Sequence, residues 1–412
     1  MRGGTKSARL PLVDSLRAVA ALLIFGYHAL FVTGHLSSTN YGYYLSVGVP
    51  LFYCISGLLL FRPFARSLIQ GEERPSTRDY GRHRLFRIVP AYWLALPLVA
   101  VLLGRTAQVF TGGGVVTYFG FLQAYRLETF VGGIGQAWTL CVEVAFYVFL
   151  PFWAALLALI VSRVAATTKS RGRVVLAGLG LLILASVAWK VMVVSHYGGD
   201  RAGAIVPLTA LPAALDQFAL GMLIAVLLVM REGGERSSHL LALCSRRPWV
   251  PALAALMAYG LIGAVHGNSP FGSIGFGSQA WGLATVTDHE LRALVAGGLV
   301  LAGVCAVPGI GLVGRTLGSG WLSRVGEISY GLYLWHLAVL TVLAGNLHWA
   351  LGEHGYLAEP GGEGVTGSWP VVLLAVLVSL AVSIGLAGLS WTLVEKRLIA
   401  LSHRRRQVVQ GR

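Results

Sequence analysis

Long apolar runs alternate with short polar segments along this chain. Runs of about 18 to 24 apolar residues are long enough to cross the hydrocarbon core of a bilayer as helices. Ten such runs are present, at residues 12–33, 43–61, 88–104, 138–161, 174–194, 207–230, 249–266, 292–314, 327–346 and 370–394. The pattern therefore predicts an all-α integral membrane protein with about ten transmembrane helices.

The segment near residues 115–125 is also apolar but is not counted among the ten spans. A span at this point would move the basic loop 162–173 to the opposite side of the membrane. We therefore predict a re-entrant or interfacial segment near 115–125.

The basic residues predict the orientation of the spans. Of the 32 Lys and Arg residues, 26 fall in the two ends and in the loops expected on the same side, and only four fall in the opposite loops. Cytoplasmic loops carry such an excess of Lys and Arg, so we expect a multi-pass protein of the plasma membrane with both termini cytoplasmic. The chain then divides into a basic tail (1–11), a membrane domain (12–395) and a second basic tail (396–412), the tails being suited to anionic lipids.

Composition supports this class of protein. The 412 residues are 56% hydrophobic and 12% charged, whereas soluble domains carry about 25% charged residues. A net charge of +15 would suit nucleic acid, but the charges lie in short loops between spans, so we expect no nucleic-acid partner. The four cysteines have no metal-ligand spacing and predict neither a metal site nor a disulfide framework.

The first apolar run contains two ionisable residues, Arg17 and His28. An Arg at the bilayer centre costs at least about 2.5 kcal/mol, so such residues usually mark a functional site. Their spacing brings both side chains to one helix face, about 16 Å apart along the axis. His28 suits general-base catalysis, although a His bonded to a backbone carbonyl also fits this position. Asp14, one turn before Arg17, is placed to pair with it or to help cap the helix.

The third and fourth spans carry further charges. Arg84 and Arg87 are three residues apart and share one helix face. They form a natural phosphate clamp, although the ordinary excess of cytoplasmic Arg also explains them. Glu143 lies in the fourth span, with Tyr147 one turn further on the same face. Glu143 is a candidate partner for an intramembrane His or Arg, a contact to an acceptor substrate, or a hydrogen-bonding link between helices.

The ninth span opens with a polar stripe of Ser329, Tyr333 and His336 on one helix face. An interfacial aromatic belt is the alternative interpretation, and it accounts less readily for a deep His. Lys190 and Asp216 are further intramembrane charges that are candidates to neutralise each other, although nothing in the sequence fixes that pairing.

Six segments, taken together and in order, resemble the acyltransferase 3 family of integral-membrane acyltransferases. They are DSLRAVAALLIFGYH from Asp14, GVPLFYCISGLLLFRP from Gly48, RHRLFRIVPAYW from Arg82, WTLCVEVAFYVFLP from Trp138, FALGMLIA from Phe218 and ISYGLYLWH from Ile328. Any one segment is weak evidence, whereas six in the right order are specific. Cys54 and Thr139 depart from the family pattern, but neither change removes a proposed catalytic group.

The resemblance implies a ten-helix bundle that transfers an acyl group, commonly acetyl, from cytoplasmic acyl-CoA. The acceptor would be a hydroxyl on a carbohydrate, a glycolipid or a glycosylated, macrolide-like metabolite. It implies His28 and Glu143 as catalytic residues, and Arg17, Arg84 and Arg87 as acyl-CoA ligands. Six further residues would support the acceptor side: Asp14, Trp138, Tyr147, Ser329, Tyr333 and His336. Acyl-CoA is then a co-substrate, and we expect neither a permanently bound cofactor nor a metal.

Three other classes of membrane protein compete with this interpretation. A transporter or flippase for a lipid-linked or sugar substrate also has many spans and buried charges, but no inverted pair of interrupted helices is apparent. A haem-binding electron carrier would use His28 and His336 as axial ligands. A structural scaffold would leave several buried charges without a role. The sequence does not identify the acceptor, the acyl chain or the oligomeric state. It also does not decide between direct transfer and a covalent acyl-His intermediate.

Overall fold

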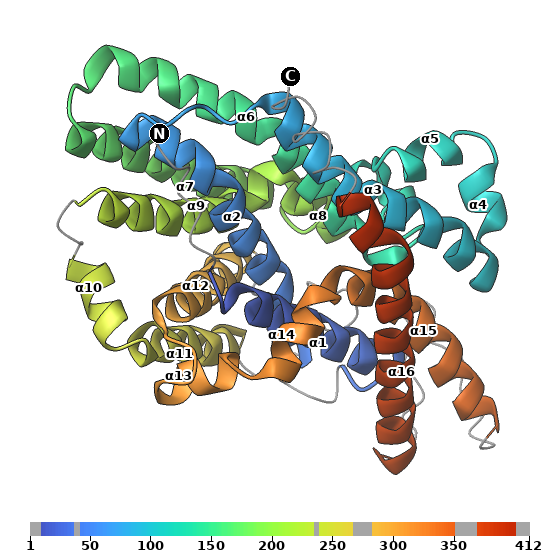
Figure 1. Cartoon of the computed structure of the whole chain (residues 1–412). Helices are drawn as coiled ribbons and strands as arrows, with labels where there is room; N and C mark the ends of the chain where they lie inside the picture. Colours follow the sequence, from blue (N-terminus) through green and yellow to red (C-terminus); the bar gives the residue numbers. More distant parts are fainter. Residues whose placement is uncertain (1–9, 37–41, 235–238, 267–281, 351–368, 401–412) are drawn as a thin grey trace.

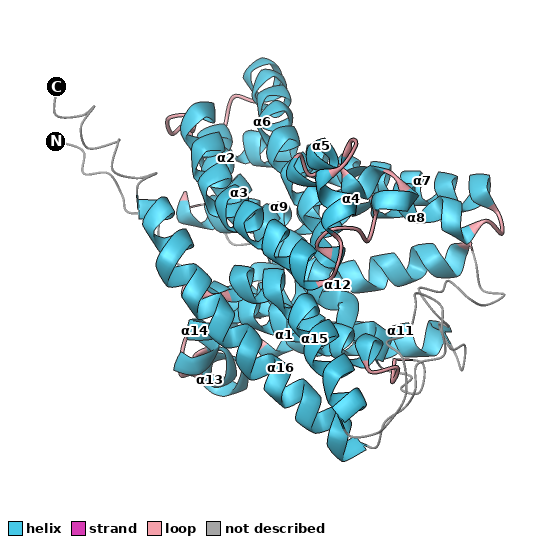
Figure 2. Cartoon of the chain, turned by 90° about the vertical axis from the view of Figure 1, so that its right-hand side faces the viewer, coloured by secondary structure: helices cyan, strands magenta, loops and turns pink. Residues whose placement is uncertain are grey.

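The chain forms a bundle of helices with no strand among its described residues (Figure 2). The computed structural model describes residues 10–36, 42–234, 239–266, 282–350 and 369–400. Its long helices are α1 (Val13–Val32), α2 (Gly48–Gln70), α3 (Thr77–Leu102), α6 (Trp138–Val164), α7 (Thr168–Tyr197), α9 (Leu211–Glu232), α11 (Trp249–His266), α12 (Leu283–Cys305), α15 (Ser329–Ala350) and α16 (Trp369–Ser390). The all-α prediction is confirmed, and each predicted apolar run overlaps one of these helices.

Short helical segments connect the long ones. They are η1 (Gly42–Val47), α4 (Thr106–Phe110), α5 (Gly114–Phe119), η2 (Gln123–Tyr125), η3 (Leu127–Thr129), η4 (Gly135–Ala137), α8 (Arg201–Thr209), α10 (His239–Arg246), α13 (Gly311–Leu317), α14 (Gly320–Glu327) and the π-helical turn η5 (Trp391–Glu395). The basic tails lie almost wholly outside the described residues, so their contact with lipid stays a prediction.

Seven helices of the described chain are long and apolar enough to cross a membrane. The bent pair α14 and α15, which meet at 75°, raises the number to eight if the pair forms one span. These helices make the chain a multi-pass membrane protein. The number of ten spans and the cytoplasmic termini remain predictions, because α11 has a short apolar part and α12 carries several charges.

Helix α12 lies nine residues earlier in the chain than the expected span 292–314. It ends at Cys305, shortly before Pro308, and Gly309 follows with a φ of +79°. A proline disfavours helical geometry in the residue before it and has no backbone N–H to donate, so the helix stops there. The shift brings Asp288 and Glu290 into the helix.

The segment near 115–125 forms no spanning helix. It contains the short helix α5 and the 3-10 turn η2; α4 precedes it, and the 3-10 turns η3 and η4 follow it. Arg105 closes the segment by donating from Nη1 to the carbonyl oxygens of Val131 and Gly133, at 3.1 and 3.0 Å. The hydroxyl of Tyr92 on α3 donates to the carbonyl oxygen of Tyr118 at 2.9 Å. These contacts satisfy backbone groups that an extra helix would otherwise pair.

Helices α2 and α9 pack closely through two glycines. A Cβ atom at Gly57 would lie 2.0 Å from the carbonyl oxygen of Phe218, and one at Gly221 would lie 1.9 Å from that of Cys54. Small residues let membrane helices approach closely enough for van der Waals packing to hold them. The ISG and FALGM segments therefore form one helix crossing.

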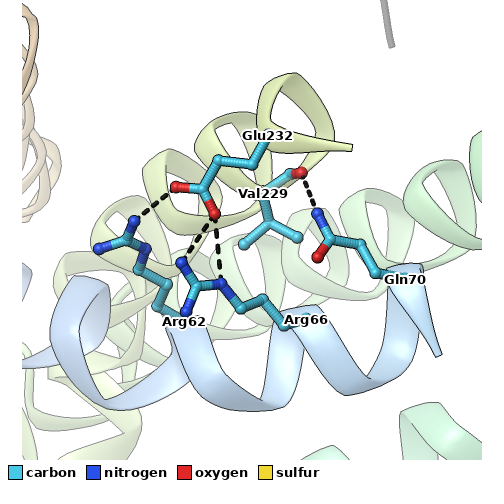
Figure 3. A network of polar contacts seen from close by, with 5 residues as sticks. All are labelled: Arg62, Arg66, Gln70, Val229 and Glu232. Carbon is cyan, nitrogen blue, oxygen red and sulfur yellow. Dashed lines mark hydrogen bonds and ion pairs between the residues drawn. The ribbon is translucent and has the colours of Figure 1, made fainter. Parts of the chain in front are cut away.

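The same two helices are also joined by ion pairs at one end (Figure 3). Arg62 and Arg66 on α2 hold the carboxylate of Glu232 on α9, at 2.5 and 2.9 Å. Gln70 donates to the carbonyl oxygen of Val229 at 2.7 Å. The polar contacts at this end and the close glycine contacts along the crossing together hold α2 against α9.

Helix α1 occupies the middle of the bundle, where it packs against α2, α12, α14 and α15 (Figure 1). Gly326 on α14 allows a close approach, because a Cβ atom there would lie 1.8 Å from the carbonyl oxygen of Asp14. This central position lets one face of α1 meet residues from several helices.

Candidate active site

A cavity lies where α1, α2, α3, α6 and α15 meet. Apolar side chains form much of its wall, and its polar residues are Arg17, Tyr53, Ser56, Arg87, Thr139, Glu143, Tyr147, Ser329, Tyr330 and Tyr333. A mainly apolar cavity with a few convergent polar groups is the usual form of a small-molecule site. Six of the eleven residues expected to form the site line this one cavity: Arg17, Arg87, Glu143, Tyr147, Ser329 and Tyr333.

Glu143 accepts hydrogen bonds from two helices. The Tyr147 hydroxyl, one turn further along α6, donates to its Oε1 at 2.6 Å, and the Ser56 hydroxyl of α2 donates to the same atom at 2.8 Å. Arg17 and Arg84 lie close enough to interact with it electrostatically. Two donors and nearby cations fit an ionised carboxylate, which only accepts. Glu143 therefore links α2 to α6 and also faces the cavity.

Positive charge gathers at one end of the cavity, where Arg17 of α1 lies near Arg87 of α3. Arg87 and Arg17 line the cavity, and Arg84 lies one turn before Arg87, outside the lining. The Nε atom of Arg84 is buried without a hydrogen-bond partner in the described part of the chain. Asp14 pairs with Arg17 at 3.7 Å, and α1 has no side-chain cap. Guanidinium groups in such a cluster suit an anionic ligand.

The two intramembrane histidines contact each other one helical turn beyond residues that line the cavity. Nε2 of His336 lies 2.9 Å from Nδ1 of His28. Neither ring lines the cavity, but Ile24, one turn before His28, and Tyr333, three residues before His336, both do. The two imidazole rings contact each other directly where α1 packs against α15.

Tyr333 joins the start of α6 to α15. Its hydroxyl donates to the carbonyl oxygen of Gln136 at 2.6 Å and also contacts the hydroxyl of Thr139. The Gln136 amide donates to the carbonyl oxygens of Tyr333 and Leu334, at 2.8 and 3.1 Å. Thr139 is one of the two departures from the family pattern. Its hydroxyl still forms a hydrogen bond, with the hydroxyl of Tyr333.

The sequence did not point to several residues of this site. Ser56, Gln136 and Tyr330 were not expected, although Ser56 lies inside the ISG segment and so had a signal. Trp138 does not line the cavity, and its ring instead stacks on Phe130 with centroids 5.4 Å apart. Its role on the acceptor side stays a prediction.

A second buried polar cluster lies outside the cavity. Lys190 Nζ on α7 contacts Asp216 Oδ2 on α9 at 2.9 Å, so the candidate pairing is present. Ser186 donates to Oδ1 of the same carboxylate at 3.0 Å, and Glu290 on α12 also contacts Lys190. This cluster ties three helices together.

Comparison with known proteins adds one result. A family model described as an acyltransferase domain matches residues 11–388, nearly the whole chain. Neither the curated proteins nor the solved structures give a match. The matched region contains every helix that lines the cavity, and the chain therefore belongs to the acyltransferase 3 family.

Proposed function

We propose that this protein transfers an acyl group, commonly acetyl, from cytoplasmic acyl-CoA to an acceptor hydroxyl. The acceptor is a carbohydrate, a glycolipid or a glycosylated, macrolide-like metabolite. One observation carries the proposal: a single cavity has guanidinium groups at one end, and the imidazole pair lies one helical turn beyond other residues that line it. Family membership supports the reaction class of acyl transfer.

The guanidinium end of the cavity suits the phosphates of CoA. Arg84 and Arg87 share one face of α3, and Arg17 faces them from α1. Guanidinium groups bind phosphate oxygens with paired hydrogen bonds. The pantetheine arm would then follow the face of α1 from Arg17 toward His28, a rise of about 16 Å over eleven residues.

His28 acts as the general base in this proposal. It would take the proton of the acceptor hydroxyl while the oxygen attacks the thioester carbonyl. Glu143, Tyr147, Ser329 and Tyr333 face the cavity and would contact the bound thioester or acceptor. A covalent acyl-His28 intermediate is the alternative course for the same residue.

The direct test is acyl transfer by the purified, lipid-reconstituted protein from labelled acetyl-CoA. We expect transfer by the wild type and its loss in His28→Ala, with exposed His196→Gln as the control. Full transfer by His28→Ala would reject the catalytic assignment. Movement of an acceptor across the bilayer without any acyl transfer would favour the transporter or flippase alternative.

The acceptor and acyl chain can be identified together by mass spectrometry. Envelope lipids and glycans from cells with and without the protein should differ by the mass of one acyl group on one class of molecule. Incubation with labelled acetyl-CoA alone distinguishes the two courses, because only the covalent course leaves label on the protein.

A further inference from the structure

Three backbone contacts determine which ring nitrogen carries the proton in each intramembrane histidine. Nδ1 of His336 lies 3.1 Å from the carbonyl oxygen of Leu332 and 2.9 Å from that of Tyr333. Nδ1 of His28 lies 3.1 Å from the carbonyl oxygen of Ile24. A carbonyl oxygen only accepts hydrogen bonds, so Nδ1 carries the hydrogen in both rings.

The direction of the bond between the two rings follows. The Nε2 atom of neutral His336 has a lone pair, and it accepts the hydrogen of His28 Nδ1 across 2.9 Å. This one hydrogen is shared with the carbonyl oxygen of Ile24. The reverse direction would turn ring lone pairs toward all three carbonyl oxygens. The Nε2 atom of His28 is therefore left as the ring nitrogen with a lone pair available for a substrate proton.

We infer that His336 is a positioning residue that completes a two-histidine base with His28. The inference rests on the proposed function, in which Nε2 of His28 accepts the hydroxyl proton. His336 keeps that nitrogen unprotonated and correctly oriented. In catalytic triads an Asp bonded to the His ring has this orienting role. Among the described residues no carboxylate bonds to either ring, so a neutral imidazole takes this place.

The second ring also stabilises the charge that forms during transfer. A lone imidazolium in the apolar interior would be costly. When His28 gains a proton, its Nδ1–H bond to His336 becomes charge-assisted and strengthens. His336 can accept that charge because its own Nδ1–H is already bonded to two carbonyl oxygens.

In the proposed step the acyl group moves from the sulfur of CoA to the acceptor oxygen. The O–H bond of the acceptor breaks and its proton goes to Nε2 of His28, while the oxygen forms a bond to the acyl carbon. The C–S bond of the thioester then breaks, and the departing CoA thiolate receives the proton held by the histidine pair. The pair ends in its starting state.

Nitrogen NMR of the intact protein in lipid tests the pairing without relying on activity. In protein labelled with 15N-histidine, we expect Nδ1 protonated and Nε2 unprotonated for both rings at a pH where they are neutral. Loss of signals in His28→Gln and His336→Gln assigns them. A ring protonated at Nε2 in the wild type would overturn the inference.

Kinetics test the positioning role. His336→Leu removes the acceptor, and we expect kcat to fall by about 100-fold or more, with KM for acetyl-CoA changed by less than about twofold. His336→Gln supplies an amide oxygen in place of Nε2, so it should retain kcat to within about tenfold. His196→Gln, on the exposed end of α7, is the control.

Two kinetic outcomes would overturn the inference. One is a wild-type kcat in His336→Leu, and the other is an equal loss in the Leu and Gln variants when both remain folded. A wild-type protein that transfers no acyl group would instead reject the proposed function, and the NMR spectra would still decide the pairing.

Discussion

The hydroxyl of Ser56 on α2 donates a hydrogen bond to the carboxylate of Glu143 on α6 at 2.8 Å. The two residues lie 87 positions apart in the chain. Because Tyr147 donates to the same oxygen, the carboxylate has a fixed orientation at the wall of the cavity. Its removal should therefore affect the cavity as well as the contact between α2 and α6.

Glu143→Gln should lower kcat/KM for acyl transfer by about 10- to 100-fold, because hydrogen bonds to a charged group are worth about 1.5–3 kcal/mol. The neutral amide is a weaker acceptor for Ser56 and Tyr147. Ser56→Ala and Tyr147→Phe each remove one donor and should have smaller effects. Steady-state kinetics with labelled acetyl-CoA measure all three, and full activity of Glu143→Gln would contradict the role of the charge.

Arg87→Gln should raise KM for acetyl-CoA by about tenfold or more while changing kcat little, since it removes a proposed phosphate ligand. Arg87→Lys keeps the charge but loses the paired geometry, so it should fall between Gln and the wild type. Arg173→Gln on α7, an exposed basic position, is the matched control. An unchanged KM in Arg87→Gln would exclude Arg87 as a CoA ligand.

Lys190→Met should destabilise the protein by about 3–5 kcal/mol, because it leaves the buried carboxylate of Asp216 without its cation. Thermal unfolding in detergent measures the loss. Lys169→Met, at the exposed beginning of the same helix α7, should leave the unfolding temperature nearly unchanged. Equal unfolding temperatures for the two variants would show that the buried ion pair contributes little.

Gly221→Ala should lower stability by about 1–3 kcal/mol, because the added methyl group would meet the carbonyl oxygen of Cys54 and push α2 away from α9. Gly180→Ala on α7 is a matched control, since a Cβ atom there meets nothing within 4 Å. It should be neutral or slightly stabilising, as alanine favours a helix. A tolerated Gly221→Ala would mean that this helix crossing can widen at low cost.

Much of the helix pattern was predictable from the sequence. Apolar runs predict helices in lipid because no water is present to satisfy free backbone groups. The boundaries of α11 agree with the predicted run 249–266, whereas α12 begins nine residues before its run. The hydropathy pattern missed this start because Asp288 and Glu290 are charged. Both residues are tolerated in α12 because they contact basic side chains, Arg292 and Lys190.

The candidate site was predictable in part. Arg17 and His28 were placed on one helix face because the pitch of an α-helix fixes the azimuth of every side chain. Asp216 was a candidate partner for Lys190 because both are charges in apolar runs. Ser56 had only its place in the ISG segment as a signal, and Gln136 gave little. A polar residue near a helix contact is common, and its partner lies on a different helix.

The sequence by itself determined the class of protein, the approximate helices, and which residues share a helix face, since all three depend on local hydropathy and helix geometry. Only the tertiary structure decided the partners. His28 and His336 are 308 residues apart, and nothing local relates them. Their contact depends on how closely α1 and α15 approach and at what rotation, which is set by the packing of the whole bundle. The same packing brings two intramembrane histidines from different helices into one hydrogen-bonded pair.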